Sequence, residues 1–99
     1  MTNTDRVRTC IPAEWKSGRL SGRGEVRNVS DGGLFVGCRS LPEEGSTVNV
    51  TLCAPGKARV EVKGLVWWTT PLDQSTRAGF GLRVLDEDVA YQSFVASQR

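Results

Sequence analysis

The sequence predicts an all-β fold, a small antiparallel β-barrel of six strands with a short C-terminal helix. Several short runs alternate apolar and polar residues with a period of two, as a strand with one buried face does. Gly, Pro and Ser residues separate these runs at near-regular intervals, which is typical of small antiparallel barrels. Closing the sheet into a barrel also leaves no free strand edge to pair with other chains.

The N-terminal part of the chain predicts three strands. The first covers residues 9–16, where Pro12 favours a sheet edge or a bulge because proline lacks the backbone N–H of a ladder. A polar connection follows, and a second strand covers 24–29. The turn at 30–33 contains two glycines and leads into a third strand over 34–38.

The middle of the chain predicts two further strands. Pro and Gly residues mark a loop at 41–45, and residues 47–52 then alternate strictly between apolar and polar. After a turn at 54–57 the alternation continues over 60–68. Gly64 lies inside that fifth strand, where an isolated glycine indicates a bend or a bulge.

The adjacent residues Trp67 and Trp68 should face opposite sides of the fifth strand, because side chains alternate along a strand. Trp68 continues the phase of the buried valines, so we expect it in the core and Trp67 at the surface. A polar loop over 69–78 then leads to a sixth strand over 79–85.

The C-terminal tail from Asp86 predicts a short helix. Asp86 or Asp88 is expected to cap it, since a carboxylate accepts backbone N–H bonds and suits the positive N-terminal end of a helix. Four apolar residues at helical spacing are expected to pack on the barrel: Ala90, Tyr91, Phe94 and Val95.

Length and charge describe one ordinary domain. The chain has 99 residues and a net charge of +2, too small to indicate a nucleic-acid partner. Residues 1–27 hold six basic against three acidic residues, so the basic excess lies next to the turn at 30–33. No apolar run is long enough to span a membrane and no signal peptide is visible, so we expect no membrane association.

The cysteines and the missing histidine limit the chemistry. Cys10, Cys38 and Cys53 are odd in number and lack Cys-x-x-Cys spacing, which argues against a metal site and against a disulfide framework. Free thiols are typical of the cytoplasm, which we expect as the location. Without histidine, Ser-His-Asp and Cys-His catalysis are excluded. We therefore expect no enzyme activity, catalytic residue or cofactor.

Asn28, Ser30 and Gly33 form an Asn-x-Ser-x-x-Gly pattern where the second strand turns into the third. Alternate residues of a strand face the same side, so the Asn28 amide and the Ser30 hydroxyl should project together. That pair is suited to reading the polar edge of a flat ligand. A plain polar hairpin turn explains the same residues, and the pattern alone leaves both interpretations open.

The order of these segments resembles the PilZ domain, a bacterial six-stranded barrel that receives cyclic di-GMP. Residues 6–97 carry the resemblance, and residues 1–5 are expected to be a flexible arm before it. Four stretches match the family's first strand, its Asp/Asn-x-Ser-x-x-Gly motif, the loop and strand after it, and its Gly-x-Gly closing strand: residues 6–15, 28–36, 41–48 and 79–84.

The family's ligand site joins that motif to an Arg-x-x-x-Arg segment just before the first strand. The resemblance implies that the polar side chains of Asn28 and Ser30 read a guanine of cyclic di-GMP, and that Gly33 belongs to the same ligand site and lets the backbone approach closely. It places Arg6 at the second arginine of the pair and Thr2 at the first, so the pair is incomplete in this chain. Arg8 is then expected to compensate by reaching a phosphate.

Two functions follow from the resemblance. The first is a single-domain regulator in cyclic di-GMP signalling that acts on a partner protein in trans, with nucleotide binding weakened by the missing arginine. The alternative is an adaptor that binds no nucleotide and works only through protein contacts, for example in motility or polarity control. Trp67 and Phe35 are the expected partner contacts. We expect a monomer or a weak dimer.

Overall fold

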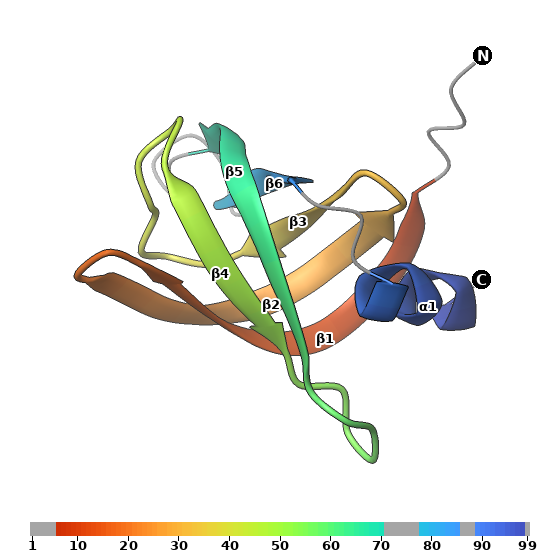
Figure 1. The fold of residues 1–99 in the computed structure, drawn as a ribbon. Coiled ribbons are helices and arrows are strands. Elements are labelled where there is room, and N and C mark those ends of the chain that lie inside the picture. Colours follow the sequence, from red (N-terminus) through yellow and green to blue (C-terminus); the bar gives the residue numbers. More distant parts are fainter. Residues whose placement is uncertain (1–5, 71–77, 86–88, 99) are drawn as a thin grey trace.

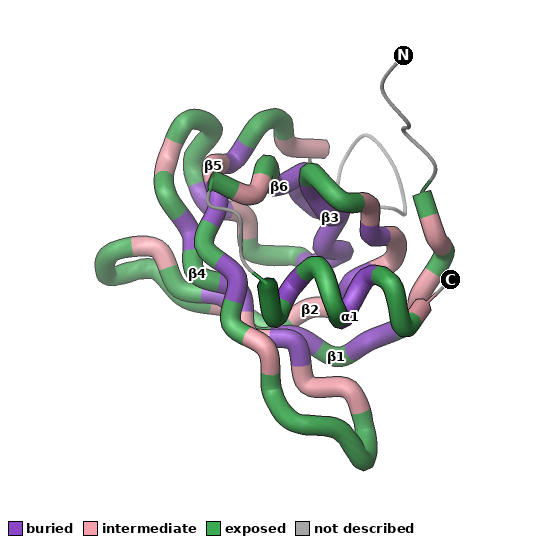
Figure 2. The backbone as a smooth tube through the Cα atoms, turned by 45° about the vertical axis from the view of Figure 1, so that its right-hand side comes forward, coloured by how far each residue is buried: buried purple, intermediate pink, exposed green. Residues whose placement is uncertain are grey.

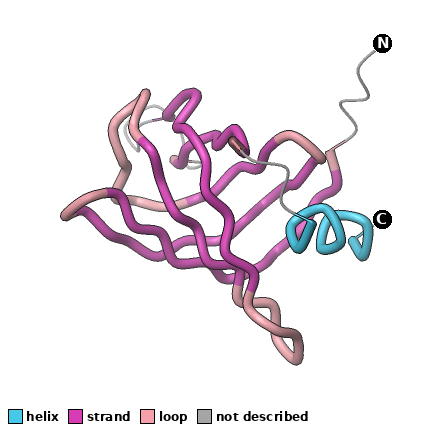
Figure 3. The backbone as a smooth tube through the Cα atoms, in the orientation of Figure 1, coloured by secondary structure: helices cyan, strands magenta, loops and turns pink. Residues whose placement is uncertain are grey.

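The computed structural model describes residues 6–70, 78–85 and 89–98, most of which lie in β-strands (Figure 3). The described elements are β1 (Val7–Ser17), β2 (Leu20–Ser30), β3 (Gly33–Gly37), β4 (Thr47–Leu52), β5 (Val60–Thr70), β6 (Gly79–Val84) and α1 (Val89–Gln98). The strands close into a barrel in the order β1-β2-β3-β6-β5-β4, and every pairing is antiparallel (Figure 1). The predicted fold class is therefore confirmed.

Strand boundaries differ from the prediction mainly at the first hairpin. The polar residues between the first two strands were expected to form a connection, but nearly all of them belong to β1 or β2. The turn is only Gly18-Arg19, and Gly18 adopts a φ of 59°, which glycine reaches without strain. The long hairpin projects from the side of the barrel (Figure 1).

Three register shifts bend the barrel wall. They lie between Arg8 and Ile11 in β1, between Val26 and Asn28 in β2, and between Val66 and Trp68 in β5. The bulge inferred from Pro12 is thus present immediately before it. An extra residue of this kind changes which side of the strand the following side chains face.

The bulge expected at Gly64 is not there. Gly64 pairs regularly with Val48 on β4 and Val84 on β6, and a Cβ at this position would lie 2.6 Å from the backbone carbonyl of Arg83. The irregularity falls at Trp67 instead, because β6 pairs Leu82 with Val66 and Gly81 with Trp68.

The prediction of a buried Trp68 is wrong for the same reason. Trp67 is 59% exposed and Trp68 is 41% exposed. The strict alternation that put Trp68 in phase with the core valines holds only as far as Val66, which is buried. Trp67 faces outward as expected, and the bulge then places Trp68 on the same outer side.

The core lies inside the barrel and is closed by the helix. Buried residues alternate with exposed ones along β1 and β4 (Figure 2). Trp15 of β1 meets Phe80 of β6 edge to face, with ring centroids 5.8 Å apart. The largest fully buried side chains come from all six strands and the helix: Trp15, Tyr91, Phe80, Leu34, Leu52, Val26, Val29, Val36, Val48, Val50, Val62 and Val66.

Helix α1 packs against β1 and β5 through Tyr91, Phe94 and Val95 (Figure 1). Ala90 was expected on the same face but is exposed. The proposed caps Asp86 and Asp88 lie outside the described residues. No helix in the described ranges is both long and apolar enough to cross a membrane.

Candidate ligand site

The site is built around the tight turn that joins β2 to β3. Ser30 and Gly33 pair across it, with Asp31 and Gly32 at its tip. The Ser30 hydroxyl donates to the Gly33 carbonyl at 3.3 Å, and the Val84 N–H of β6 donates to the Gly32 carbonyl at 2.9 Å. The turn is thus tied to a strand that is distant in sequence.

Gly33 is required by space rather than by backbone angle, because its φ is not positive. A Cβ at Gly33 would overlap the carbonyl oxygen of Leu82 on β6. The adjacent Gly32 has nothing within 4 Å of the corresponding position. The glycine of the motif therefore allows β3 and β6 to approach closely beneath the turn.

Tyr91 of α1 also holds the turn. Its hydroxyl lies 2.7 Å from the Ser30 carbonyl and 2.8 Å from the Gly33 carbonyl, so its one proton is shared between them. Tyr91 is fully buried. We expected only apolar packing from this residue, since nothing in the sequence brings the helix to the motif.

Asn28 and Ser30 face outward, because Val29 between them is fully buried and both neighbours are partly exposed. Arg6 Nη1 donates to Asn28 Oδ1 at 2.5 Å. This contact joins the segment before β1 to the motif on β2. It leaves the other guanidinium donors of Arg6 to face solvent or a ligand.

A row of residues crosses the outer face of the barrel beside the motif. Consecutive pairings join Arg8 of β1, Asn28 of β2, Phe35 of β3, Gly81 of β6 and Trp68 of β5. The Phe35 and Trp68 rings stack over Gly81 with centroids 5.2 Å apart and planes 19° apart. Within this stacked pair Phe35 is only 9% exposed, so Trp68 presents the aromatic surface here.

A pocket of about 280 Å³ opens between the turn and this row. The turn side contributes Ser30, Gly32 and Gly33, and Arg6 lies beside them. The facing wall comes from β5 and β6: Trp67, Trp68, Gly81, Leu82 and Arg83. The Arg83 guanidinium lies 5.2 Å from the centroid of the Trp67 ring, a cation–π contact.

The other predicted ligand residues line a neighbouring hollow. Arg8 and Asn28 lie there with Thr9, Glu25, Arg27 and Phe35. The predicted set is therefore divided: Arg6, Ser30 and Gly33 line one pocket, Arg8 and Asn28 the next. The Arg6–Asn28 hydrogen bond connects the two.

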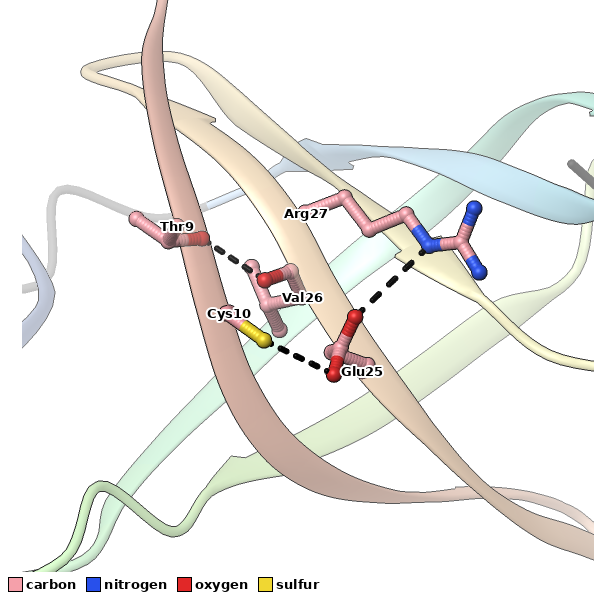
Figure 4. Close-up of polar contacts among 5 residues, drawn as sticks. All are labelled: Thr9, Cys10, Glu25, Val26 and Arg27. Atoms are coloured by element: carbon pink, nitrogen blue, oxygen red, sulfur yellow. Dashed lines mark hydrogen bonds and ion pairs between the residues drawn. The ribbon is translucent and has the colours of Figure 1, made fainter.

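Polar contacts organise the second hollow around Glu25 (Figure 4). The Cys10 thiol donates to Glu25 Oε2 at 3.0 Å, and Arg27 Nε lies 3.9 Å from Glu25 Oε1. The hydrogen bond to Glu25 and the negative charge of that carboxylate raise the pKa of Cys10. The higher pKa favours the protonated thiol. In the part of the chain that the structure describes, no three potential metal ligands lie close enough together to hold a metal ion.

The first pocket combines the groups that a nucleotide needs. Guanidinium groups bind phosphate oxygens or the O6/N7 edge of guanine, and tryptophan rings offer stacking surfaces. A glycine-rich turn lets backbone approach the ligand. Reasoning from the sequence found Arg6, Ser30 and Gly33 but missed Arg83 and Trp68. The outward position of Trp68 depends on the β5 bulge, and the place of Arg83 beside the motif depends on the pairing of β6 with β3.

Comparison with known proteins agrees with this architecture. A model of the PilZ domain family matches residues 2–96. The Bacillus subtilis inhibitor of motility MotI/DgrA superposes with a TM-score of 0.73 at 15% identity over 93% of this chain. The PilZ domain of CeSA from a cellulose-synthesizing bacterium superposes with a TM-score of 0.63 at 16% identity, covering 95% of this chain and 92% of that domain. No curated protein sequence matches.

The likeness to MotI/DgrA concerns only part of that protein. This chain covers 46% of the MotI/DgrA chain, about half its length. At these identities both superpositions establish the fold.

Proposed function

This chain belongs to the PilZ domain family, and from that premise we propose that it is a regulatory protein that binds cyclic di-GMP and acts on a partner protein. One observation carries the proposal. Arg6 is hydrogen-bonded to Asn28 and lines the same pocket as Ser30 and Gly33. Three residues of the family's turn motif and one arginine of its basic segment therefore lie close together, which supports the proposal.

The size of the pocket supports a ligand held in part at the surface. Its volume of about 280 Å³ is just below the ~300–1,000 Å³ of most small-molecule pockets. One base or phosphate of the dinucleotide occupies it, and the remainder extends over the Arg8–Asn28 hollow. Arg8 lines that hollow and binds the distal part of the ligand.

The proposed role of the protein is regulatory and not catalytic. The protein passes the signal to a partner protein, which contacts the exposed face around Trp67. The fold shared with an inhibitor of motility supports a motility-related output. Cys10, Cys38 and Cys53 are all free, which supports a reducing cytoplasmic location.

The second candidate function is an adaptor that binds no cyclic di-GMP. Thr2 occupies the place of the first arginine in the family's basic segment, and that observation favours it. A hydrogen bond to a charged group contributes about 1.5–3 kcal/mol, so the loss of one arginine weakens binding about ten- to a hundredfold.

Calorimetric titration with cyclic di-GMP, with GTP as the control ligand, separates the two functions. We expect saturable binding at micromolar affinity, abolished in Arg6→Ala and Ser30→Ala. Arg59→Ala is the matched control, because Arg59 is exposed and lies in a hollow that shares no residue with either site. No heat from the wild-type protein at high ligand concentration would contradict the receptor function and leave the adaptor.

A further inference from the structure

The pocket beside the motif is lined by a second arginine, which comes from β6. Arg83 of β6 pairs directly with Gly33 of β3, and the next residue, Val84, donates its N–H to the Gly32 carbonyl. Leu82 before it is buried, so Arg83 faces outward from the barrel. Backbone pairing with Gly33 thus places Arg83 next to the turn that also positions Ser30.

Trp67 orients the Arg83 side chain. Trp67 follows the buried Val66 and faces outward, and the guanidinium lies over its ring at 5.2 Å from the centroid. Stacking on a ring face leaves the in-plane N–H donors of a guanidinium free to bind an anion. Within the described ranges no carboxylate forms an ion pair with Arg83.

Two cations therefore border one pocket. Arg6 approaches from the segment before β1, and Arg83 approaches from β6. Charges of one sign around a concave site attract an oppositely charged ligand. Phosphate suits this arrangement, because its oxygens accept hydrogen bonds from more than one guanidinium.

We propose that Arg83 is the second cation of the pocket that Arg6 lines and that it binds a phosphate oxygen of the dinucleotide, with Trp67 as its positioning residue. It supplies from β6 the charge that the basic segment lacks at Thr2. This inference rests on the proposed function, since it names a contact for the same ligand. It also explains how an incomplete Arg-x-x-x-Arg segment remains compatible with binding.

The test is calorimetric titration of Arg83 variants with cyclic di-GMP at low and at physiological salt. Arg83→Ala is expected to weaken binding about ten- to a hundredfold. It is also expected to reduce the salt dependence of the affinity, because one charged contact to phosphate is lost. Arg83→Lys keeps the charge but not the planar fork, so its affinity should lie between those of the wild type and Arg83→Ala. Arg59→Ala should bind as the wild type does.

Trp67 variants test the positioning role. Trp67→Ala should weaken binding, and Trp67→Phe should restore most of the affinity because it keeps a ring face beneath the guanidinium. A purely structural role would give the same affinity for both variants once folding is verified by thermal melting. Arg83→Gln, which preserves most of the side-chain volume, replaces Arg83→Ala if the alanine variant does not fold.

The outcomes separate this inference from the proposed function. If Arg83→Ala binds as the wild type does while Arg6→Ala and Ser30→Ala lose binding, Arg83 is not part of the site and the receptor function stands. If the wild-type protein does not bind cyclic di-GMP, both proposals are overturned.

Discussion

Several glycines around the pocket matter because they lack a side chain. Gly33 lies against the Leu82 carbonyl, and Gly81 lies beneath the Trp68 indole. Gly37 lies under the Arg27 guanidinium in the same way. A Cβ at any of these positions would overlap its neighbour, so close approach is the reason for the glycine. At Gly81 and Gly37 an outer-face side chain lies directly on the barrel wall, and at Gly33 the backbones of β3 and β6 approach closely.

Gly33→Ala is expected to destabilise the protein by about 1–3 kcal/mol, because β3 and β6 must separate to admit the methyl group. Urea denaturation followed by circular dichroism measures this change. Gly32→Ala is the matched control, since its Cβ would meet nothing within 4 Å and its φ is not positive. We expect that control to stay within about 0.5 kcal/mol of the wild type. Equal effects in both variants would contradict the close-approach explanation.

Cys38 is expected to react slowly. Burial raises the pKa of its thiol from 9.0 to about 11, so at pH 8 the folded protein holds about a hundredfold less thiolate than the unfolded chain. Since the folded state binds the proton more tightly, its stability should fall as the pH rises from 9 towards 11. Pulsed alkylation with mass spectrometry, with and without urea, checks the rate. Comparable labelling of folded and unfolded Cys38 would disprove the shift.

At the scale of elements, the bulges decide which side chains reach the site. The shift in β5 turns Trp68 outward beside Trp67, and the shift in β2 leaves Arg27 and Asn28 both partly exposed. Helix α1 then fastens the β2–β3 turn through Tyr91. The helix therefore closes the core and supports the ligand site at once.

Tyr91→Phe should cost about 1–3 kcal/mol, because it removes a buried hydroxyl that satisfies the Ser30 and Gly33 carbonyls. It should also speed hydrogen exchange at the turn amides, which native-state exchange by NMR measures. Gln92→Ala, at an exposed position of the same helix, serves as the control. Unchanged exchange at residues 30–33 in Tyr91→Phe would show that the helix does not hold the turn.

At the scale of the whole molecule, barrel closure joins segments that are distant in sequence. β1 pairs with both β2 and β4, and β6 lies between β3 and β5. The pocket depends on the β3–β6 and β5–β6 pairings, because these bring residues 30–33 next to residues 67–68 and 81–83.

Removing residues 89–99 is expected to unfold most of the population. The deletion withdraws the buried Tyr91, Phe94 and Val95, and burial of a Phe or Val side chain contributes about 1.5–3 kcal/mol. That loss approaches the ~5–15 kcal/mol total stability of a typical domain. Loss of dispersion in the amide NMR spectrum is the measurement. A truncated chain with a native spectrum would show that the barrel core is stable without the helix.

Much of the fold was predictable from local pattern. The strict alternation over 47–52 matches β4, and the two glycines after Ser30 mark the β2–β3 turn. Local pattern failed at Trp68, because a bulge interrupts the period of two without a marker in the sequence. It failed at Ala90 because helical spacing alone does not say how wide a buried face the barrel covers.

The sequence by itself determined the number and order of the strands, the β2–β3 turn and the Asn28–Ser30–Gly33 motif, because these depend on side-chain alternation and on residues close together in the chain. Only the tertiary structure decided that Arg6 contacts Asn28, that Tyr91 supports the turn, and that Arg83 faces the motif. The physical reason is that those contacts follow from sheet order and register. Both are set by packing of the whole barrel, which no local stretch of sequence encodes.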